Sequence, residues 1–466
     1  MFSMGNLGHN RDMSYYGKYP FLVRKCISMG QRVGDLLNHA RTMYKDQLSL
    51  FDYDLFSGRG SRCETNHFHI ILESSLKWPL KLNDQRVKGV FMHEYVHYIQ
   101  HLCTLCGLSI SENYNRMFVV YRDFLEHHNT IEMPLLLMKD SSVLQNFFEY
   151  FNKIKGTRKY SDQIDEISVA KEDIETARLG RTAVPVKTYN KETKQWNSIS
   201  PLQVGYYSVI ESMADLVQRI YNPGVEHEDS PYLVVQKICE KFYPKACQDY
   251  GQMVALCMCA LMDSNPGVGL FDAIDFAKSQ SGISGYCLYL NYINEHHILL
   301  PHGKEVSIQE MFYRRLSDYK ATLSMVFGRV DGYYVKAIDN ALVEAATGRN
   351  LLLSLIYDDK VPVDSYFDKL ADFYGFPYIE THDLTLWPGL KKRAIDAAVA
   401  VGFEILFKRL TSKGNTDCPR SDSCRRNGQY EYECSFDQWN HKTPCPFTAA
   451  MHYFNLKGKS FINDPK

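Results

Sequence analysis

Residues 91–101, FMHEYVHYIQH, constrain this 466-residue chain more than any other segment. They place His93, Glu94 and His97 in a run whose other residues are mostly apolar. Laid out as an α-helix, these three side chains and His101 fall within one arc of about 100° on an otherwise apolar cylinder. An ordinary surface helix would carry Lys, Arg and Glu there. The segment therefore predicts a buried helix whose ionisable groups need a partner.

The spacing of the two histidines indicates what that partner is. His93 and His97 are four residues apart, so both side chains lie on one helix face, one turn apart. Two imidazoles in this arrangement can both bind a Zn²⁺ ion at about 2.0–2.1 Å. Glu94 lies beside the first ligand, where its carboxylate could deprotonate a zinc-bound water. The alternative is an amphipathic helix with hydrogen-bonded histidines.

A catalytic zinc site needs a third protein ligand. His101 is eight residues from His93, about 12 Å along the helix axis, which is too far to share the ion. Cys103 and Cys106 form a C-x-x-C pair that points to the other side of the helix, and we interpret them as buried thiols.

A strongly amphipathic segment downstream, residues 206–221, offers the third ligand. Glu211 and Asp215 are four residues apart on one face of this predicted helix. Glu211 could give the zinc a carboxylate oxygen, and Asp215 could accept a hydrogen bond from the far nitrogen of a ligand histidine. In the alternative interpretation both acids face water, because other polar residues share their arc.

The two segments together resemble the gluzincin class of zinc metallopeptidases, the thermolysin-like group, whose pattern is H-E-x-x-H followed by E-x-x-x-D on a later helix. The resemblance implies a zincin-like fold, zinc-dependent peptide hydrolysis, Glu94 as general base and Asp215 as the residue that orients a ligand histidine. It departs from thermolysin in the 113 residues that separate the two motifs and in Ile210, where Asn is frequent. The matching residues are His93, Glu94, His97, Glu211 and Asp215.

Catalysis of this kind also needs a donor that stabilises the transition state. We take Tyr207, one turn before Glu211, and His297, in the segment NEHHILLPHG, as catalytic candidates. Ordinary packing or surface exposure is the alternative for both. The resemblance further implies that the strand at 67–73, just before the metal helix, is an edge strand that pairs with an extended substrate.

Four cysteines near the end of the chain form a second candidate site. They are spaced C-x5-C-x9-C-x10-C and could hold a structural zinc, with His441 able to replace one of them. An iron–sulfur cluster, disulfides or free redox-active thiols are the alternatives. The residues concerned are Cys418, Cys424, Cys434 and Cys445.

Hydrophobic periodicity predicts a helix-dominated α+β chain with a strand at 67–73 and a β-hairpin at 184–200. We expect an N-terminal region at 1–85, a zincin-like core at 86–300 with an insertion at 108–202, a helical region at 301–411 and a Cys-rich subdomain at 412–466. The expected helices are 31–48, 86–106, 114–127, 134–155, 161–179, 203–221, 231–243, 250–263, 307–326, 333–347 and 390–411.

Composition bounds the remaining possibilities. The net charge of -1 disfavours a broad nucleic-acid surface, and no apolar run approaches the roughly 20 residues of a membrane span. The absence of a secretory signal and the 13 mostly scattered cysteines predict a cytoplasmic protein with reduced thiols. We expect a zinc endopeptidase with a protein or peptide substrate. The alternatives are an inactive zincin-like scaffold and a redox-responsive binding protein built on the four cysteines. The oligomeric state is not indicated.

Overall fold

The structure is a computed structural model that describes residues 62–63, 69–72 and 85–463, apart from gaps at 136, 138–140, 159, 161–162, 281, 301, 328–332, 376, 382–385, 388–401, 403–404, 408, 412–420, 427–445 and 457. All described residues belong to one compact unit, Gly58–Lys466. The predicted helix at 31–48 lies outside the described residues. The predicted boundaries after residues 85, 300 and 411 stay predictions.

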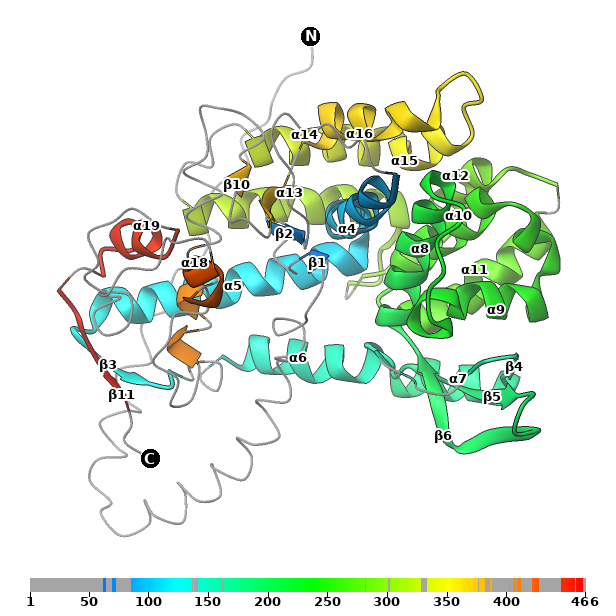
Figure 1. Ribbon diagram of the computed structural model, residues 1–466, viewed down its shortest axis with the longest axis horizontal. Coiled ribbons are helices and arrows are strands. Elements are labelled where there is room, and N and C mark those ends of the chain that lie inside the picture. Colours follow the sequence, from blue (N-terminus) through cyan, green and yellow to red (C-terminus); the bar gives the residue numbers. More distant parts are fainter. Residues whose placement is uncertain are drawn as a thin grey trace. The chain divides into compact units, whose positions relative to one another are not determined.

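The described residues form a helix-dominated α+β structure, as predicted (Figure 1). The helices are α4 (Gln85–Cys103), α5 (Leu105–His127), α6 (Ser142–Ile154), α7 (Lys171–Gly180), α8 (Tyr206–Tyr221), η3 (Asp229–Leu233), α9 (Val234–Phe242), η4 (Pro244–Gln248), α10 (Tyr250–Leu261), α11 (Pro266–Ser279), α12 (Gly285–Glu295), α13 (Ile308–Phe327), α14 (Tyr333–Thr347), α15 (Leu351–Ile356), η5 (Val363–Ser365), α16 (Tyr366–Tyr374), α18 (Ser421–Arg426) and α19 (Pro446–Tyr453). The strands are β1 (Arg62–Cys63), β2 (His69–Leu72), β3 (Thr130–Met133), β4 (Glu166–Ser168), β5 (Val184–Asn190), β6 (Gln195–Val204), β7 (His297–Leu299), β8 (Glu305–Ser307), β9 (Tyr378–Thr381), β10 (Leu386–Trp387) and β11 (Ser460–Asn463).

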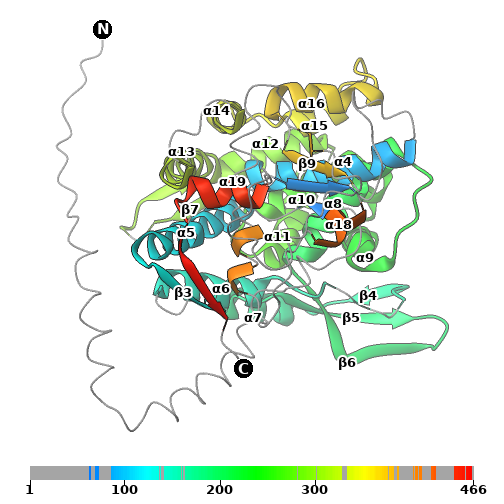
Figure 2. The ribbon, with the colours of Figure 1, turned by 60° about the vertical axis from the view of Figure 1, so that its left-hand side comes forward.

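Two of these helices, α4 and α8, pack against each other and run antiparallel. Gly89 near the start of α4 lies against Gln218 on the last turns of α8. Gln100 near the end of α4 donates a hydrogen bond to the carbonyl oxygen of Ile210, at 2.9 Å. Helix α4 is buried along its whole length from Phe91 onward, as its apolar sequence predicts. Helices α5, α10 and α14 also contact this pair, so the seam between α4 and α8 lies inside the helical core (Figure 2).

The largest sheet among the described residues has the strand order β1-β2-β9-β10. Strand β2 pairs with β1 in the antiparallel direction and with β9 in the parallel direction, where His69 lies opposite Tyr378. The predicted strand at 67–73 is thus present as β2. The implied role of β2 as an edge that pairs with substrate is wrong, because a neighbouring strand occupies each side.

The predicted single helix at 86–106 is divided in two. Helix α4 ends at Cys103 and α5 begins at Leu105, with Thr104 as the N-cap, whose hydroxyl accepts a hydrogen bond from the Gly107 amide at 3.1 Å. A Cβ atom on Gly107 would lie only 2.2 Å from the Gln100 carbonyl oxygen, so this crossing of the two helices requires glycine. The C-x-x-C pair consequently spans two helices.

The predicted helix at 161–179 is also wrong in its first half. Residues Glu166–Ser168 form β4, which pairs with β5, and only α7 is helical. Pairing with the predicted hairpin, present as β5 and β6, therefore outweighs the helix propensity of this segment. Helices α6, α9, α10 and α14 lie within the segments that were expected to be helical, and α13 extends one residue beyond the segment expected at 307–326.

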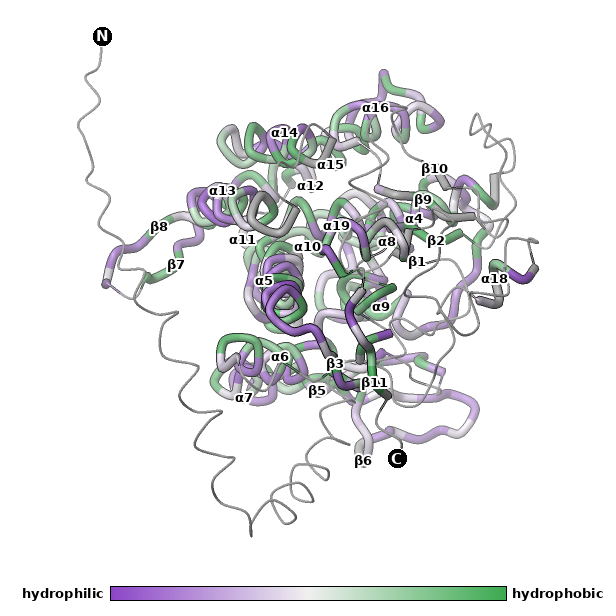
Figure 3. The backbone as a smooth tube through the Cα atoms, turned by 90° about the vertical axis from the view of Figure 1, so that its left-hand side faces the viewer, coloured by the Kyte–Doolittle hydropathy of each residue, from purple (hydrophilic) through white to green (hydrophobic). Residues whose placement is uncertain are grey.

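Hydropathy follows the helical faces. Figure 3 shows purple and green residues alternating along α5 and α13, as expected of helices with one buried side and one exposed side. Helix α10, by contrast, is buried on every side from Gly251 to Leu261. Within the described part of the chain, no helix combines the length and the apolar character that a membrane span requires.

Candidate metal centre

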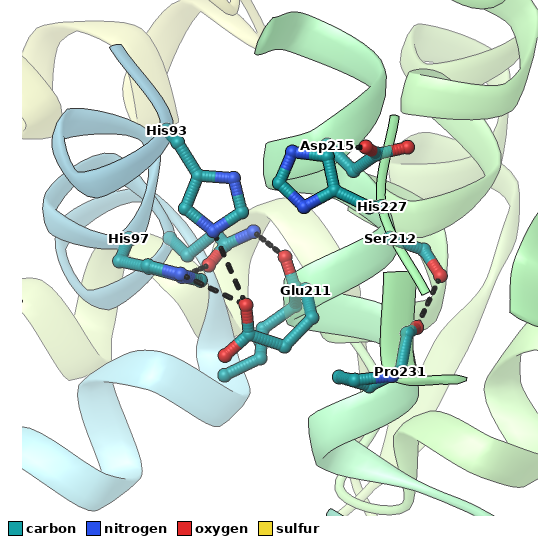
Figure 4. Close-up of polar contacts among 9 residues, drawn as sticks. His93, His97, Glu211, Ser212, Asp215, His227 and Pro231 are labelled. Atoms are coloured by element: carbon teal, nitrogen blue, oxygen red, sulfur yellow. Dashed lines mark hydrogen bonds and ion pairs between the residues drawn. The ribbon is translucent and has the colours of Figure 1, made fainter. Parts of the chain in front are cut away.

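His93, His97 and Glu211 converge at the seam between α4 and α8 (Figure 4). The Nε2 atom of His93 lies 3.2 Å from Oε2 of Glu211, and the Nε2 atom of His97 lies 3.4 Å from the same oxygen. One ligand atom from each residue falls within 4.8 Å of the other two. The structure thus brings together the three residues that the sequence suggested as metal ligands.

The spacing of these atoms fits a tetrahedral metal ion. Ligand atoms about 2.0–2.1 Å from a tetrahedral ion are about 3.3–3.4 Å from one another. The two measured separations from Glu211, 3.2 and 3.4 Å, agree with that value. The donor set of two imidazoles and one carboxylate is a common set for catalytic zinc, and it leaves the fourth position open. The residues present therefore fit a zinc ion.

Burial of Glu211 and Asp215 rules out the interpretation in which both acids face water. The side chain of Glu211 is 22% exposed, and that of Asp215 is 1% exposed. Both lie on the face of α8 that includes Gln218, which contacts α4. The other polar residues of the same arc include Ser208 and Ser212, and both are buried as well. The polar arc of this helix is therefore not a solvent-exposed face.

The second nitrogen of His97 is held by Gln100, which the sequence analysis did not identify. Nδ1 of His97 lies 2.8 Å from Oε1 of Gln100, so the ring donates through Nδ1 and keeps Nε2 for a metal. The amide nitrogen of Gln100 donates to the Ile210 carbonyl on α8. The available sequence signal was the position of Gln100, three residues after His97 on the same helix.

Charges within this cluster shift the pKa values of His97 and Glu211. Burial alone would lower the pKa of His97, but Glu211 and, more weakly, Glu94 raise it to about 9. Burial would raise the pKa of Glu211, yet the two histidines hold it well below its usual value. Without a metal, the Glu211 carboxylate therefore lies beside a protonated His97 ring. A divalent cation would take the place of that proton.

The surroundings of His93 are less complete. Its Nδ1 atom is buried without a hydrogen bond, and so are both carboxylate oxygens of Asp215. Asp215 lies 2.9 Å from Nε of Arg219 and 3.9 Å from Nε2 of His227 instead, in ion-pair range. The hydrogen bond predicted from a ligand histidine to Asp215 is thus not made, because Asp215 is held in these other contacts and His227 stacks on His93.

The segment that follows α8 contributes two residues that the sequence analysis missed. The His227 ring stacks parallel to that of His93, with centroids 6.1 Å apart. The Tyr232 ring lies 4.5 Å from His227 and 5.8 Å from His93. Burial raises the pKa of the Tyr232 phenol, and the nearby Glu211 and Glu94 raise it further. The phenol therefore keeps its proton at neutral pH and can donate it in a hydrogen bond.

Glu94, the predicted general base, is buried beside these groups. It is 6% exposed, and it lies close enough to His97 and Tyr232 to raise the pKa of each. A carboxylate in this position shares the immediate surroundings of the metal ligands without belonging to the three-residue cluster.

The two predicted transition-state donors lie elsewhere. Tyr207 is buried, and its ring contacts Phe151 and the guanidinium of Arg158. His297 is exposed on the β7–β8 hairpin, where its Nδ1 atom bonds to the Glu295 carbonyl oxygen at 2.9 Å. The hairpin extends away from α4 and α8 (Figures 2 and 3). His297 is therefore not near the candidate centre, whereas the Tyr232 ring lies 5.8 Å from that of His93.

The remaining candidates on α4 and α5 lie outside the centre. His101 is buried, and its Nδ1 atom lies 3.4 Å from the hydroxyl oxygen of Ser111. Burial, followed by the charge of His97, lowers the pKa of His101 to about 4. Cys103 and Cys106 are buried, and burial raises the pKa of both thiols, as expected of unreactive core cysteines. Among the described residues, His93, His97 and Glu211 are the only group of three or more His, Cys, Asp or Glu side chains placed so that they could hold a metal ion.

The C-terminal cysteine site cannot be placed in the same way. Cys418, Cys434 and Cys445 lie outside the described residues, and Cys424 is half-buried in α18.

Comparisons of the sequence and the fold with protein-family models, with curated proteins and with solved structures found no match. The resemblance to gluzincins therefore rests on the five motif residues alone.

Proposed function

We propose that the protein is a zinc-dependent endopeptidase with a zincin-like core, which hydrolyses a bond in a protein or peptide substrate. The observation that carries the proposal is the convergence of three donor atoms on two helices, with the two separations from Glu211 matching tetrahedral coordination and Glu94 buried beside them. The peptide class of the substrate is what the resemblance to gluzincins implies. A structural zinc site is closed by four protein ligands, whereas these three ligands leave the fourth position open, with the buried carboxylate of Glu94 nearby.

The chemistry can be divided among the residues. Zinc held by the three ligands would polarise the substrate carbonyl and lower the pKa of a bound water toward about 7. Glu94 would accept a proton from the attacking water and pass it to the leaving nitrogen. Tyr232 would donate a hydrogen bond to the carbonyl oxygen as negative charge develops there. Gln100 would keep Nε2 of His97 directed at the ion throughout.

The test is a comparison of wild type with Glu94→Gln, using zinc analysis and a mixture of quenched fluorescent peptides. Both proteins should contain zinc at the candidate centre, and only the wild type should cleave peptides. Glu295→Gln, which makes the same change on the exposed end of α12, should behave as the wild type does. Mass spectrometry of the cut ends would define the bond preference.

Two outcomes would contradict the proposal. Full hydrolysis by Glu94→Gln would remove the general base from the mechanism. Zinc in both proteins with hydrolysis by neither would favour the inactive zincin-like scaffold.

A further inference from the structure

Among the residues that the structure describes, Arg158 has no anionic partner. Its guanidinium carbon lies 5.8 Å from the centre of the Tyr207 ring, and its Nη1 atom is buried without a hydrogen bond. The side chain as a whole is half-buried, and Nε and Nη2 are neither hydrogen-bonded nor among the buried unpaired atoms. One edge of the guanidinium is therefore accessible to solvent while its opposite corner is buried.

Other half-buried arginines of the described chain are paired. Nε of Arg219 lies 2.9 Å from Asp215, and Nη2 of Arg315 lies 2.7 Å from the buried carboxylate of Glu112. A guanidinium is always protonated, so Arg158 cannot lose its charge to match its surroundings. The Tyr207 ring offsets only part of the cost of desolvation. A carboxylate brought by a ligand would complete the site with a charge-assisted, bidentate contact.

The local backbone fixes Arg158 to the start of α8. The Tyr207 amide donates to the carbonyl oxygen of Lys155 at 2.9 Å, and the Thr157 amide donates to the Gln203 carbonyl oxygen at 2.8 Å. Gly156 between them has a φ of 75°, and a Cβ there would lie 2.5 Å from the same Gln203 oxygen. The turn that carries Arg158 is consequently packed directly on the β6–α8 junction.

This junction continues the seam that holds the metal ligands. Tyr207 is four residues before Glu211, so it lies on the same face of α8, about 6 Å along the axis. The antiparallel α4 places Gly89 opposite Gln218 and Gln100 opposite Ile210, so Tyr207 follows on the same line. This axial rise and the 5.8 Å from the Tyr207 ring to the guanidinium together make about 12 Å, a length that about four residues of extended peptide span.

We propose that Arg158 binds a carboxylate of the peptide substrate, within about four residues of the bond that is cleaved. The proposal rests on the proposed function, and it makes the protein selective for acidic sequences or for peptide C-termini. Both supply the same ligand group, a carboxylate that pairs with the fork of the guanidinium.

The first experiment compares cleavage of matched peptides that differ in one group. One series replaces Gln by Glu at each position within four residues of the cut, and another compares a free C-terminal carboxylate with its amide. Wild type should cleave the best carboxylate peptide roughly 10- to 100-fold faster in kcat/KM than its neutral match, as expected of a charge-assisted hydrogen bond. The series that shows the preference identifies the source of the carboxylate.

The variants locate that preference. Arg158→Met removes the guanidinium but keeps an unbranched side chain, and it should reduce kcat/KM for the carboxylate peptides to the value for their neutral matches. Arg158→Lys should retain part of the preference, because the charge remains and the fork is lost. Arg314→Ala, which removes the same charge from the exposed face of α13, should retain all of it. Circular dichroism and zinc content should be the same for all four proteins.

A binding measurement separates this inference from the peptidase mechanism. Fluorescence anisotropy of the same peptides with Glu94→Gln, which should bind without cleaving, should show the same carboxylate preference and its loss on adding Arg158→Met. Cleavage without any carboxylate preference, or a preference that Arg158→Met retains, would overturn the role of Arg158 and leave the peptidase intact. Selective binding through Arg158 without hydrolysis by the wild type would overturn the peptidase and leave the carboxylate site.

Discussion

The two histidines of the candidate centre differ in how their second ring nitrogens are held. Nδ1 of His97 donates to Gln100, which in turn donates to the backbone of α8. Nδ1 of His93 is buried without a hydrogen bond, and so are Nε2 of His227 and the carboxylate oxygens of Asp215, which pairs with Arg219. The His97 side is therefore fixed before a metal binds. The His93 side, which adjoins Tyr232, has unpaired groups that water, metal or substrate could complete.

The largest expected effect is the loss of zinc binding, and it should be equal for substitutions of His93 and of His97. His93→Ala and His97→Ala should each lower zinc affinity by more than about 100-fold, because a direct ligand counts for more than a supporting residue. Titration with a competing chelator measures this. Zinc bound as tightly by either variant as by the wild type would place the ion elsewhere.

The next effect should be confined to catalysis. Tyr232→Phe removes one donor and should lower kcat by about 100- to 1,000-fold, as for other transition-state donors. Zinc affinity should not change, since the hydroxyl is not a ligand. His297→Ala, on the exposed hairpin, should leave kcat unchanged. Unchanged kcat in Tyr232→Phe would mean that the His93 side is not the reactive side.

The pH dependence of stability tests a second buried acid, Glu344, which accepts hydrogen bonds, whereas Asp215 accepts none. Glu344 accepts hydrogen bonds from the Tyr374 hydroxyl and from the Leu351 amide, and burial raises its pKa from 4.5 to about 7. The unfolded chain releases this proton at lower pH than the folded chain does, so stability falls as pH rises from about 4.5 to 7. The expected loss is about 3 kcal/mol, or roughly two orders of magnitude in the unfolding constant.

Chemical denaturation at a series of pH values measures this loss. Glu344→Gln should flatten the pH dependence in that interval, and an unchanged profile would show that another group is responsible.

The smallest expected effects are on zinc affinity, and they compare directly how the second nitrogens of His97 and His93 are held. Gln100→Leu should weaken zinc binding by about 10- to 100-fold, because His97 loses the partner that sets its tautomer. Asp215→Asn should weaken it less, because Asp215 makes no hydrogen bond to His93. If Asp215→Asn costs as much as Gln100→Leu, then Asp215 orients His93 once zinc is bound, as the resemblance to gluzincins implies.

How far the sequence predicts the centre depends on the range of the interactions involved. The spacing of His93, Glu94 and His97 follows from helix geometry alone, and Glu211 follows from a second local pattern. His227 lies between α8 and η3, and Tyr232 lies in η3; no local spacing ties either residue to His93, and only tertiary packing brings their rings against it.

The fold shows the same division. The helical segments of the core were predictable from periodicity, whereas the neighbours of β2 were not, because β9 begins at Tyr378, some 300 residues later. The break between α4 and α5 is an instructive exception. Its signals, Thr104 and Gly107, are local, but the apolar pattern continues across them and conceals the break.

Gln100 links a metal ligand on one helix to the main chain of the other, and this has a mechanical consequence. A shift of α8 along α4 would displace Glu211 and pull on the amide that steadies His97 in the same movement. Zinc affinity should thus depend on the alignment of α4 and α8. Substitutions far from the ion that loosen the packing between these helices should be detected first as weaker zinc binding.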